Sequence, residues 1–194
     1  YCVDKDKDKI DFLNKGKVPI YEPGLDELIK KNFKQKKLFF TTDLKLAVQK
    51  SDIIFICVGT PTKKNSDSAN LKYVFQVANE LKKIIKKYKI IVTKSTVPVT
   101  TGDKIEKLLM TKNNEKLFNV VSNPEFLREG EAIRDFMYPD RVIVGTDSKK
   151  ANNILKNLYL PIIKKKGVYF NTSRRAAEVI KYAANAFLAT KITF

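Results

Sequence analysis

The chain has 194 residues, of which 43% are hydrophobic, so it is long enough to form one globular domain with a sizeable core. It contains no histidine, which excludes a Ser-His-Asp triad and a histidine-ligated metal within this stretch, and we expect no metal site. The net charge of +17 comes from scattered lysines while arginine is scarce, which favours solvated helix faces over a nucleic-acid groove.

Strand-like and helix-like segments alternate along the chain. The predicted strands cover residues 1–4, 39–42, 52–58, 89–93, 118–121, 142–144 and 168–170. The predicted helices cover residues 6–15, 25–34, a segment capped by Asp43, 71–87, 101–109, a segment starting at Pro124, 149–163 and a long run from Ser173. Residues 52–58 are continuously apolar, as in a strand covered on both faces. This alternation predicts an α/β fold with a doubly wound parallel sheet.

The cysteines and the length of the apolar runs indicate where in the cell the protein works. Cys2 and Cys57 lie in apolar, strand-like runs, so we expect buried free thiols in a reducing compartment, the cytoplasm. No apolar run approaches the roughly 18 residues that a membrane span needs, so we expect no membrane partner.

Two acidic residues stand out in the segment Ser122–Gly130. Asn123 is a good helix N-cap and Pro124 fits the first helical position, so a helix is predicted to begin here. Glu125 and Glu129 would then lie at i and i+4, in a first turn whose dipole favours negative charge. Acidic residues are also common in first turns and stabilise them without any further role, and this segment taken alone favours that structural interpretation over a functional site.

Ligands of such sheets bind beyond the carboxyl ends of the strands. Asp4 ends the first predicted strand, where a carboxylate can accept hydrogen bonds from an adenosine ribose or can cap a helix. After the strand at 52–58, Gly59 would let a flat ligand approach the backbone, and Thr60 and Thr62 offer hydroxyls. A plain turn between strand and helix explains the same residues.

Polar side chains also follow the strand at 89–93 and lie in the last helix. Ser95 and Thr96 stand where a strand end would face a ligand, although either hydroxyl could cap a helix. Lys181 and Asn185 are at i and i+4 in an apolar, alanine-rich run, which suggests paired donors for an oxyanion on a buried helix. The alternative is a solvent-facing stripe.

Six runs together resemble one family, the UDP-glucose 6-dehydrogenases, in order and spacing over nearly the whole chain. They are Pro19–Leu25, Val58–Thr62, Lys94–Pro98, Ser122–Gly130, Pro139–Arg141 and Lys181–Lys191. The resemblance implies a four-electron oxidation of UDP-glucose to UDP-glucuronate with two NAD, through a cysteine thioester. Glu125 would be the base for the hydrolytic water, Lys181 and Asn185 would stabilise oxyanions, and Thr96 would help to hold the water and Glu125.

The same resemblance implies sets of binding residues. For NAD they are Asp4, Lys9, Val58, Gly59, Thr60, Pro61, Thr62, Ser95, Thr96, Val97 and Glu129. For the sugar nucleotide they are Glu125, Phe126, Leu127, Arg128, Glu129, Lys181 and Asn185. We therefore expect Glu125 and Lys181, distant in sequence, to converge at a shared pocket on the rim of the sheet.

Parts of the family pattern are absent from this sequence. The glycine-rich fingerprint and the Gly-Gly-x-Cys-Phe-Pro-Lys-Asp motif are not found, so neither cysteine present is the expected nucleophile. The chain also opens within an apparent strand without methionine, so we expect a fragment. Residues 1–171 would form a truncated NAD-binding domain, and 172–194 would begin a central helix that joins subunits into a homodimer or larger assembly.

A missing first strand has structural consequences. The strands that end at Asp4 and Val58 would face an unfilled slot, so we expect the piece alone to be poorly folded and inactive. Two other functions compete with the leading one. They are a GDP-mannose or UDP-N-acetylhexosamine dehydrogenase, and a non-catalytic basic module that binds nucleotides or RNA.

Overall fold

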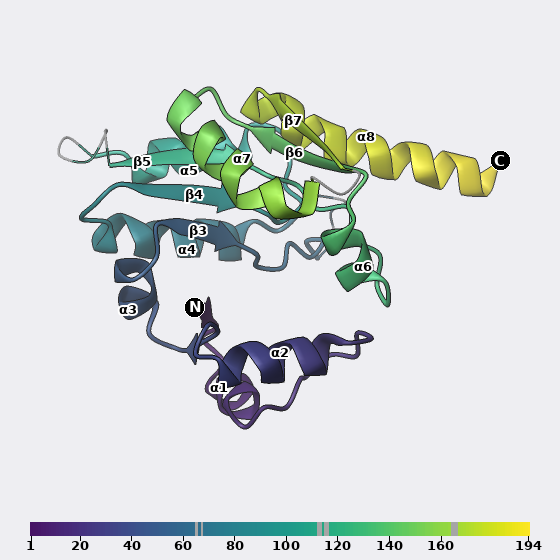
Figure 1. Ribbon diagram of the computed structural model, residues 1–194. Helices are drawn as coiled ribbons and strands as arrows, with labels where there is room; N and C mark the ends of the chain where they lie inside the picture. Colours follow the sequence, from purple (N-terminus) through teal and green to yellow (C-terminus); the bar gives the residue numbers. More distant parts are fainter. Residues whose placement is uncertain (65, 67, 112–113, 115–116, 164–166) are drawn as a thin grey trace.

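The computed structural model describes the chain except for residues 65, 67, 112–113, 115–116 and 164–166. Five strands form the larger sheet in the order β3–β4–β5–β6–β7, and two form a separate small sheet, β1–β2. Figure 1 shows the small sheet with its helices below the larger one. The strands are β1 (Cys2–Val3), β2 (Phe40–Thr41), β3 (Ile53–Ile56), β4 (Lys89–Thr93), β5 (Phe118–Ser122), β6 (Arg141–Gly145) and β7 (Val168–Thr172).

The helices follow the predicted alternation, with one exception described with the site. They are α1 (Lys7–Asn14), α2 (Leu25–Lys34), α3 (Leu44–Gln49), α4 (Lys72–Ile84), α5 (Thr101–Leu109), α6 (Ala132–Met137), α7 (Lys149–Ile163) and α8 (Arg174–Thr193). The predicted bounds of α5 and α7 are confirmed. Asp43 and Ser173 cap α3 and α8, because each side chain accepts a backbone N–H three residues on. The predicted α/β fold class is confirmed.

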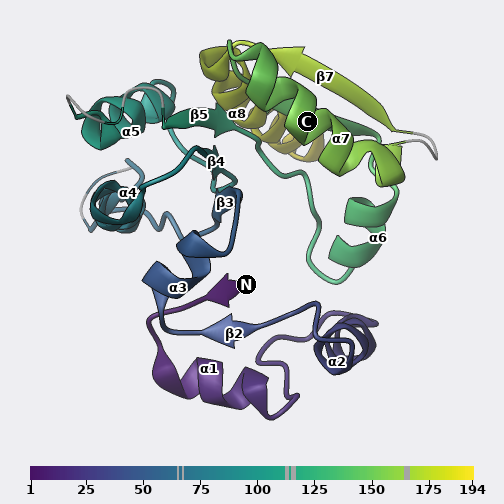
Figure 2. The same cartoon turned by 60° about the vertical axis from the view of Figure 1, so that its left-hand side comes forward.

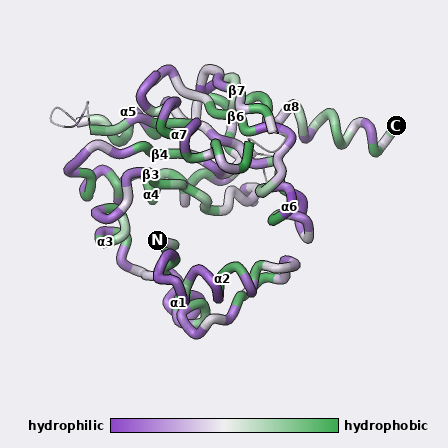
Figure 3. Tube along the Cα trace, viewed as in Figure 1, coloured by the Kyte–Doolittle hydropathy of each residue, from purple (hydrophilic) through white to green (hydrophobic). Residues whose placement is uncertain are grey.

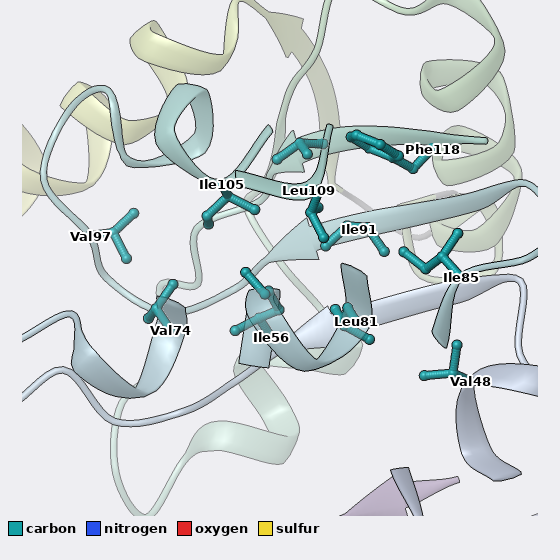
Figure 4. Packing of buried hydrophobic residues seen from close by; sticks show 12 residues of the cluster. Val48, Ile56, Val74, Leu81, Ile85, Ile91, Val97, Ile105, Leu109 and Phe118 are labelled. Atoms are coloured by element: carbon teal, nitrogen blue, oxygen red, sulfur yellow. The ribbon is translucent and has the colours of Figure 1, made fainter. Parts of the chain in front are cut away.

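Two apolar clusters hold helices on opposite faces of the larger sheet. Successive side chains of a strand point to opposite faces, so Ile91 packs against α4 and α5, whereas Ile90 and Val92 pack against α7. Figure 4 shows Ile91 in the first cluster between Leu81 of α4 and Leu109 of α5. Figure 3 shows a hydrophobic stretch in β4 and hydrophilic stretches in α1 and α6.

The larger sheet is not parallel throughout, unlike the predicted sheet. Ser122 of β5 pairs with Gly145 of β6 in antiparallel fashion, and β6 pairs with β7 in parallel fashion. The strands β6 and β7 therefore run opposite to β3, β4 and β5. An antiparallel neighbour needs no crossover helix packed on the sheet, and the β5–β6 connection contains only the short helix α6.

The gap in strand pairing falls where it was expected. The strands β1 and β3 belong to separate sheets, so β3 is an edge strand (Figure 2). The prediction that residues 52–58 are covered on both faces is wrong, because the edge leaves Phe55 exposed while Ile56 is buried. The predicted burial of the two thiols is wrong for the same reason, since Cys2 and Cys57 beside this edge are exposed.

The last helix is only half buried, which corrects the expectation of a buried helix. Ala177, Glu178 and Lys181 are buried against the body of the protein, whereas Phe187 and Ile192 are exposed on the projecting half (Figure 1). The domain boundary predicted between residues 171 and 172 stays a prediction; β7 ends at Thr172. Across the described residues, no helix combines the length and apolar character needed to cross a membrane.

Candidate active site

The segment that follows β5 is an irregular loop and not the predicted helix. Residues 123–128 have no regular structure, and α6 begins only at Ala132. Glu125 turns back on its own loop, because its Oε2 accepts the N–H of Leu127 at 2.6 Å. Short-range bonds of this kind compete with helix formation. The predicted i, i+4 stacking of Glu125 and Glu129 is therefore wrong.

Asn123 anchors the loop inside the protein and does not cap a helix. Its side chain is fully buried, and its Nδ2 donates to the carbonyl of Ile143 at 2.7 Å. Its Oδ1 accepts hydrogen bonds from the hydroxyl of Tyr159 and from the Nζ of Lys94, the latter at 3.3 Å. These partners, which come from β6, from α7 and from the residue directly after β4, fix the start of the loop.

Glu125 and Lys181 converge as predicted, although 56 residues separate them. The Nζ of Lys181 lies 3.3 Å from the Oε1 of Glu125, and the side chains are 11% and 30% exposed respectively. The same ammonium lies 5.3 Å from the ring centroid of Phe126. A carboxylate and a cation are thus held side by side, with limited access to solvent, at the carboxyl end of β5.

A cavity of about 1630 Å³ opens beside this pair. The predicted substrate residues that line it are Glu125, Phe126, Leu127, Arg128, Lys181 and Asn185. Glu129 is exposed and is not among the described residues that line the cavity. Arg128 is held by Asp135 of α6 through contacts of 3.0 and 2.7 Å from Nε and Nη2. The cavity therefore brings together six of the seven predicted substrate residues.

Lys94 is a cavity residue that the sequence reasoning did not assign. It follows β4 directly and shares the cavity with Glu125 and Lys181. Burial lowers the pKa of Lys94 to about 8, and the nearby Lys181 acts in the same direction, while Cys57 and Glu125 oppose it. Its place at a strand end, next to Ser95 and Thr96, was the available signal.

The loops after β3 and β4 are joined by hydrogen bonds. The hydroxyl of Thr60 donates to the carbonyl of Thr96 at 2.9 Å, and that of Ser95 donates to the carbonyl of Val58 at 2.6 Å. Thr96 and Val97 also line a small cavity together with Lys181 of α8. The two strand-end loops are therefore held together, and the second of them shares the small cavity with Lys181.

Asp4 and Lys9 are paired at the end of β1. The Nζ of Lys9 lies 2.7 Å from the Oδ2 of Asp4, and the Oδ1 of Asp4 accepts the N–H of Asp6 at 3.1 Å. The hydrogen bond from Lys9 lowers the pKa of Asp4 and keeps it an ionised acceptor. Across the gap, a Cβ added at Gly59 would meet nothing within 4 Å, so the backbone there is open to approach.

Glu178 is a second residue that sequence reasoning missed. This carboxylate of α8 is 3% exposed and accepts the N–H groups of Thr100 and Gly102 at 2.7 and 2.8 Å. Its Oε1 also accepts the hydroxyl of Ser122 at 3.3 Å. Burial raises the pKa of Glu178, whereas these hydrogen bonds oppose the shift. Glu178 thereby fixes α8 one turn before Lys181.

Comparisons with known proteins agree with this architecture. The chain is 48% identical over its whole length to a UDP-glucose 6-dehydrogenase of Rhizobium meliloti, covering 45% of that protein. It is 46% identical to the UDP-glucose 6-dehydrogenase TuaD of Bacillus subtilis, again over its whole length, and covers 41% of it. The chain thus spans less than half the length of these curated relatives.

Solved structures give the same relationship. A GDP-mannose dehydrogenase of Pseudomonas aeruginosa superposes with a TM-score of 0.91 at 36% identity, over 99% of this chain and 45% of that one. A UDP-glucose dehydrogenase of Pyrobaculum islandicum gives a TM-score of 0.91 at 35% identity, over 99% of this chain and 44% of that one. Residues 1–163 match the NAD-binding domain of the UDP-glucose/GDP-mannose dehydrogenase family, and the chain belongs to that family.

Proposed function

We propose that the intact protein oxidises UDP-glucose to UDP-glucuronate with NAD. The observation that carries this proposal is the 3.3 Å contact between Glu125 and Lys181, which both line a large cavity. Conversion of a primary alcohol to a carboxylate adds one water and removes four electrons, so two NAD are reduced and three protons are released. Water must therefore be activated, and the nascent negative charge must be stabilised, at the same place.

The residues of the cavity suit those two tasks. Glu125, beside a cation, is proposed to be the base that takes a proton from the hydrolytic water. Lys181 and Asn185, which both line the cavity, are proposed to stabilise oxyanions, and Thr96 to help hold the water. The backbone of residues 126–128 would hold the sugar nucleotide. We propose that Glu129 acts near the cofactor, from its exposed position on the same loop.

The strand-end residues fit a bound NAD. When bound, NAD accepts hydride from the substrate. The ionised carboxylate of Asp4, oriented by Lys9, suits the hydroxyls of an adenosine ribose and disfavours a 2′-phosphate. The open backbone at Gly59 can accept a flat group. Residues 58–62 and 95–97, whose loops are joined by the Thr60–Thr96 hydrogen bond, would line the rest of the cofactor, and Thr96 and Val97 share a small cavity with Lys181.

Turnover by the intact protein tests the proposal. We expect NADH formation, followed by its absorbance, with UDP-glucose, and two NADH for each sugar nucleotide consumed. GDP-mannose is the second candidate substrate, because a GDP-mannose dehydrogenase superposes as well as a UDP-glucose enzyme does. Faster turnover of GDP-mannose or of a UDP-N-acetylhexosamine would replace the substrate, and turnover of none of the three would refute the proposal.

We also propose that the intact protein self-associates through α8 and works in the cytoplasm. The projecting half of α8 exposes Phe187, Leu188 and Ile192, an apolar surface that a second subunit would cover. Light scattering on the intact protein should give at least twice the monomer mass. The free thiols of Cys2 and Cys57 suit a reducing compartment.

A further inference from the structure

Glu22 makes a long-range contact to which the proposed reaction assigns no role. It lies in the Pro19–Leu25 run, just before α2 in the small β1–β2 unit. Its Oε2 accepts the N–H of Gly130 at 2.9 Å, and its Oε1 accepts the N–H of Ala132 at 2.8 Å. The partners are 108 and 110 residues away in the sequence. Both carboxylate oxygens thus accept backbone N–H groups where one loop meets the start of α6.

That loop is the one that carries Glu125. It leaves β5 at the buried Asn123, passes the Glu125–Lys181 pair, and reaches Glu22 at its far end. Between these points, Arg128 is bound to Asp135. The loop is therefore held at both ends, by the large sheet at its start and by the small unit where α6 begins.

The contact spans two parts of the protein that share no strand pairing. The sheets β1–β2 and β3–β7 are separate, and Figures 1 and 2 both show the small unit with its helix α2 facing α6. The turn after Glu22 places Gly24, with a φ of 81°, next to Ile133 of α6, since a Cβ added there would lie 3.9 Å from its Cδ1. The small unit also carries Asp4 and Lys9, 2.7 Å apart at the end of β1.

We propose that Glu22 is a positioning residue that latches the cavity loop to the β1–β2 unit and couples cofactor binding to the cavity. NAD bound at Asp4 and at the strand-end loops of the large sheet would hold the two parts together, and the latch passes that restraint to residues 126–132. By reciprocity, a ligand in the cavity that orders the loop tightens NAD binding. The inference rests on the proposed function only in taking NAD as the ligand at Asp4.

Hydrogen exchange of the intact protein, with and without saturating NAD, tests the latch. In the wild type, NAD should slow exchange of the amides of Gly130 and Ala132 about tenfold, the scale of one hydrogen bond to a charged acceptor. In Glu22→Ala these amides should exchange faster without NAD and gain no protection when NAD is added. Glu22→Gln keeps one acceptor oxygen and should show an intermediate effect.

Glu27→Gln is the matched control, since it removes an exposed carboxylate from the first turn of the adjacent α2 and should behave as the wild type does.

Activity gives a second readout: Glu22→Ala should raise the KM for the sugar nucleotide about tenfold, with kcat and the melting temperature nearly unchanged. Equal NAD-induced protection in the wild type and Glu22→Ala would overturn the proposal, as would its absence in the wild type. A protein that turns over no sugar nucleotide would defeat the proposed reaction and leave the exchange experiment decisive for the latch.

Discussion

Replacement of the buried carboxylate of Glu178 should destabilise the protein strongly. Glu178→Ala removes the acceptor of the N–H groups of Thr100 and Gly102 and of the Ser122 hydroxyl. Gly102 and Ser122 are themselves buried, so water cannot readily replace the lost acceptor. Each buried donor left unpaired costs about 1–3 kcal/mol, so the expected loss is roughly 2–6 kcal/mol of unfolding free energy.

Glu178→Gln separates the charge from the geometry. A glutamine oxygen can still accept from Gly102 and Ser122, while its NH₂ group would face the N–H of Thr100 and lose that bond. The expected loss is about 1–3 kcal/mol. Burial raises the pKa of Glu178, so the folded state binds this proton more tightly than the unfolded state does. The stabilisation that this provides is present below the unfolded pKa and is lost as the pH rises through the folded pKa.

Urea denaturation of the intact protein and its variants measures both effects. The destabilisation caused by Glu178→Gln should be smaller at about pH 7 than at about pH 4, because only the wild type loses stability as Glu178 ionises. Glu80→Ala, at an exposed carboxylate of α4, is the control and should change the unfolding free energy by less than about 0.5 kcal/mol. A loss below about 1 kcal/mol for Glu178→Ala would refute the reasoning from buried hydrogen bonds.

The cavity and the strand-end loops give three more expected outcomes. The pKa of Lys94 is about 8 in the folded protein and 10.5 for an ordinary lysine, so between these pH values only the unfolded state keeps the proton. The unfolding free energy should therefore rise from pH 8 to pH 10.5, by at most about 3 kcal/mol, and this gain is lost as the pH falls through 8. Denaturation curves should show no such rise in unfolding free energy for Lys94→Met, whereas Lys104→Met, at an exposed lysine, should show the same rise as the wild type. Equal pH profiles for the wild type and Lys94→Met would contradict the burial of Lys94. A double-mutant cycle of Glu125→Gln and Lys181→Met should give a coupling of about 1 kcal/mol in unfolding free energy, and a coupling near zero would mean that the pair does not form in solution. A Cβ at Gly59 would meet nothing within 4 Å, so the melting temperature of Gly59→Ala should match that of the wild type while its Kd for NAD, from fluorescence titration, rises about tenfold; an unchanged Kd would remove Gly59 from the cofactor site.

Most of the fold follows from local patterns in the sequence. The apolar stripe of α4 and the apolar run of β4 depend on periodicity within a few residues. Both elements form; β4 has the predicted bounds, whereas α4 ends at Ile84 and not at residue 87. The caps Asp43 and Ser173 likewise act on the backbone three residues away. The burial of β3 was predicted less well, because the exposure of Phe55 depends on which strand pairs with β3 at its open edge.

The residues of the site were largely identified from sequence, but the arrangement of the loop was not. The run Asn123–Pro124–Glu125 satisfies the local rules for a helix start, yet Asn123 binds Ile143 and Tyr159, and Glu125 binds Lys181. Those partners are distant in sequence, and their contacts replace the local cap.

The amino-acid sequence alone determined the order of strands and helices, the membership of the six family-like runs, and the chemical types available at the strand ends, since each depends on neighbours along the chain. The family resemblance led us to expect that Glu125 and Lys181 converge, but only the tertiary structure decided their 3.3 Å contact, the burial of Glu178, and the contact by which Glu22 holds the far end of the loop. These contacts join residues between 56 and 110 positions apart, and no local pattern encodes them, because each forms only when packed helices and sheets bring a donor and an acceptor together.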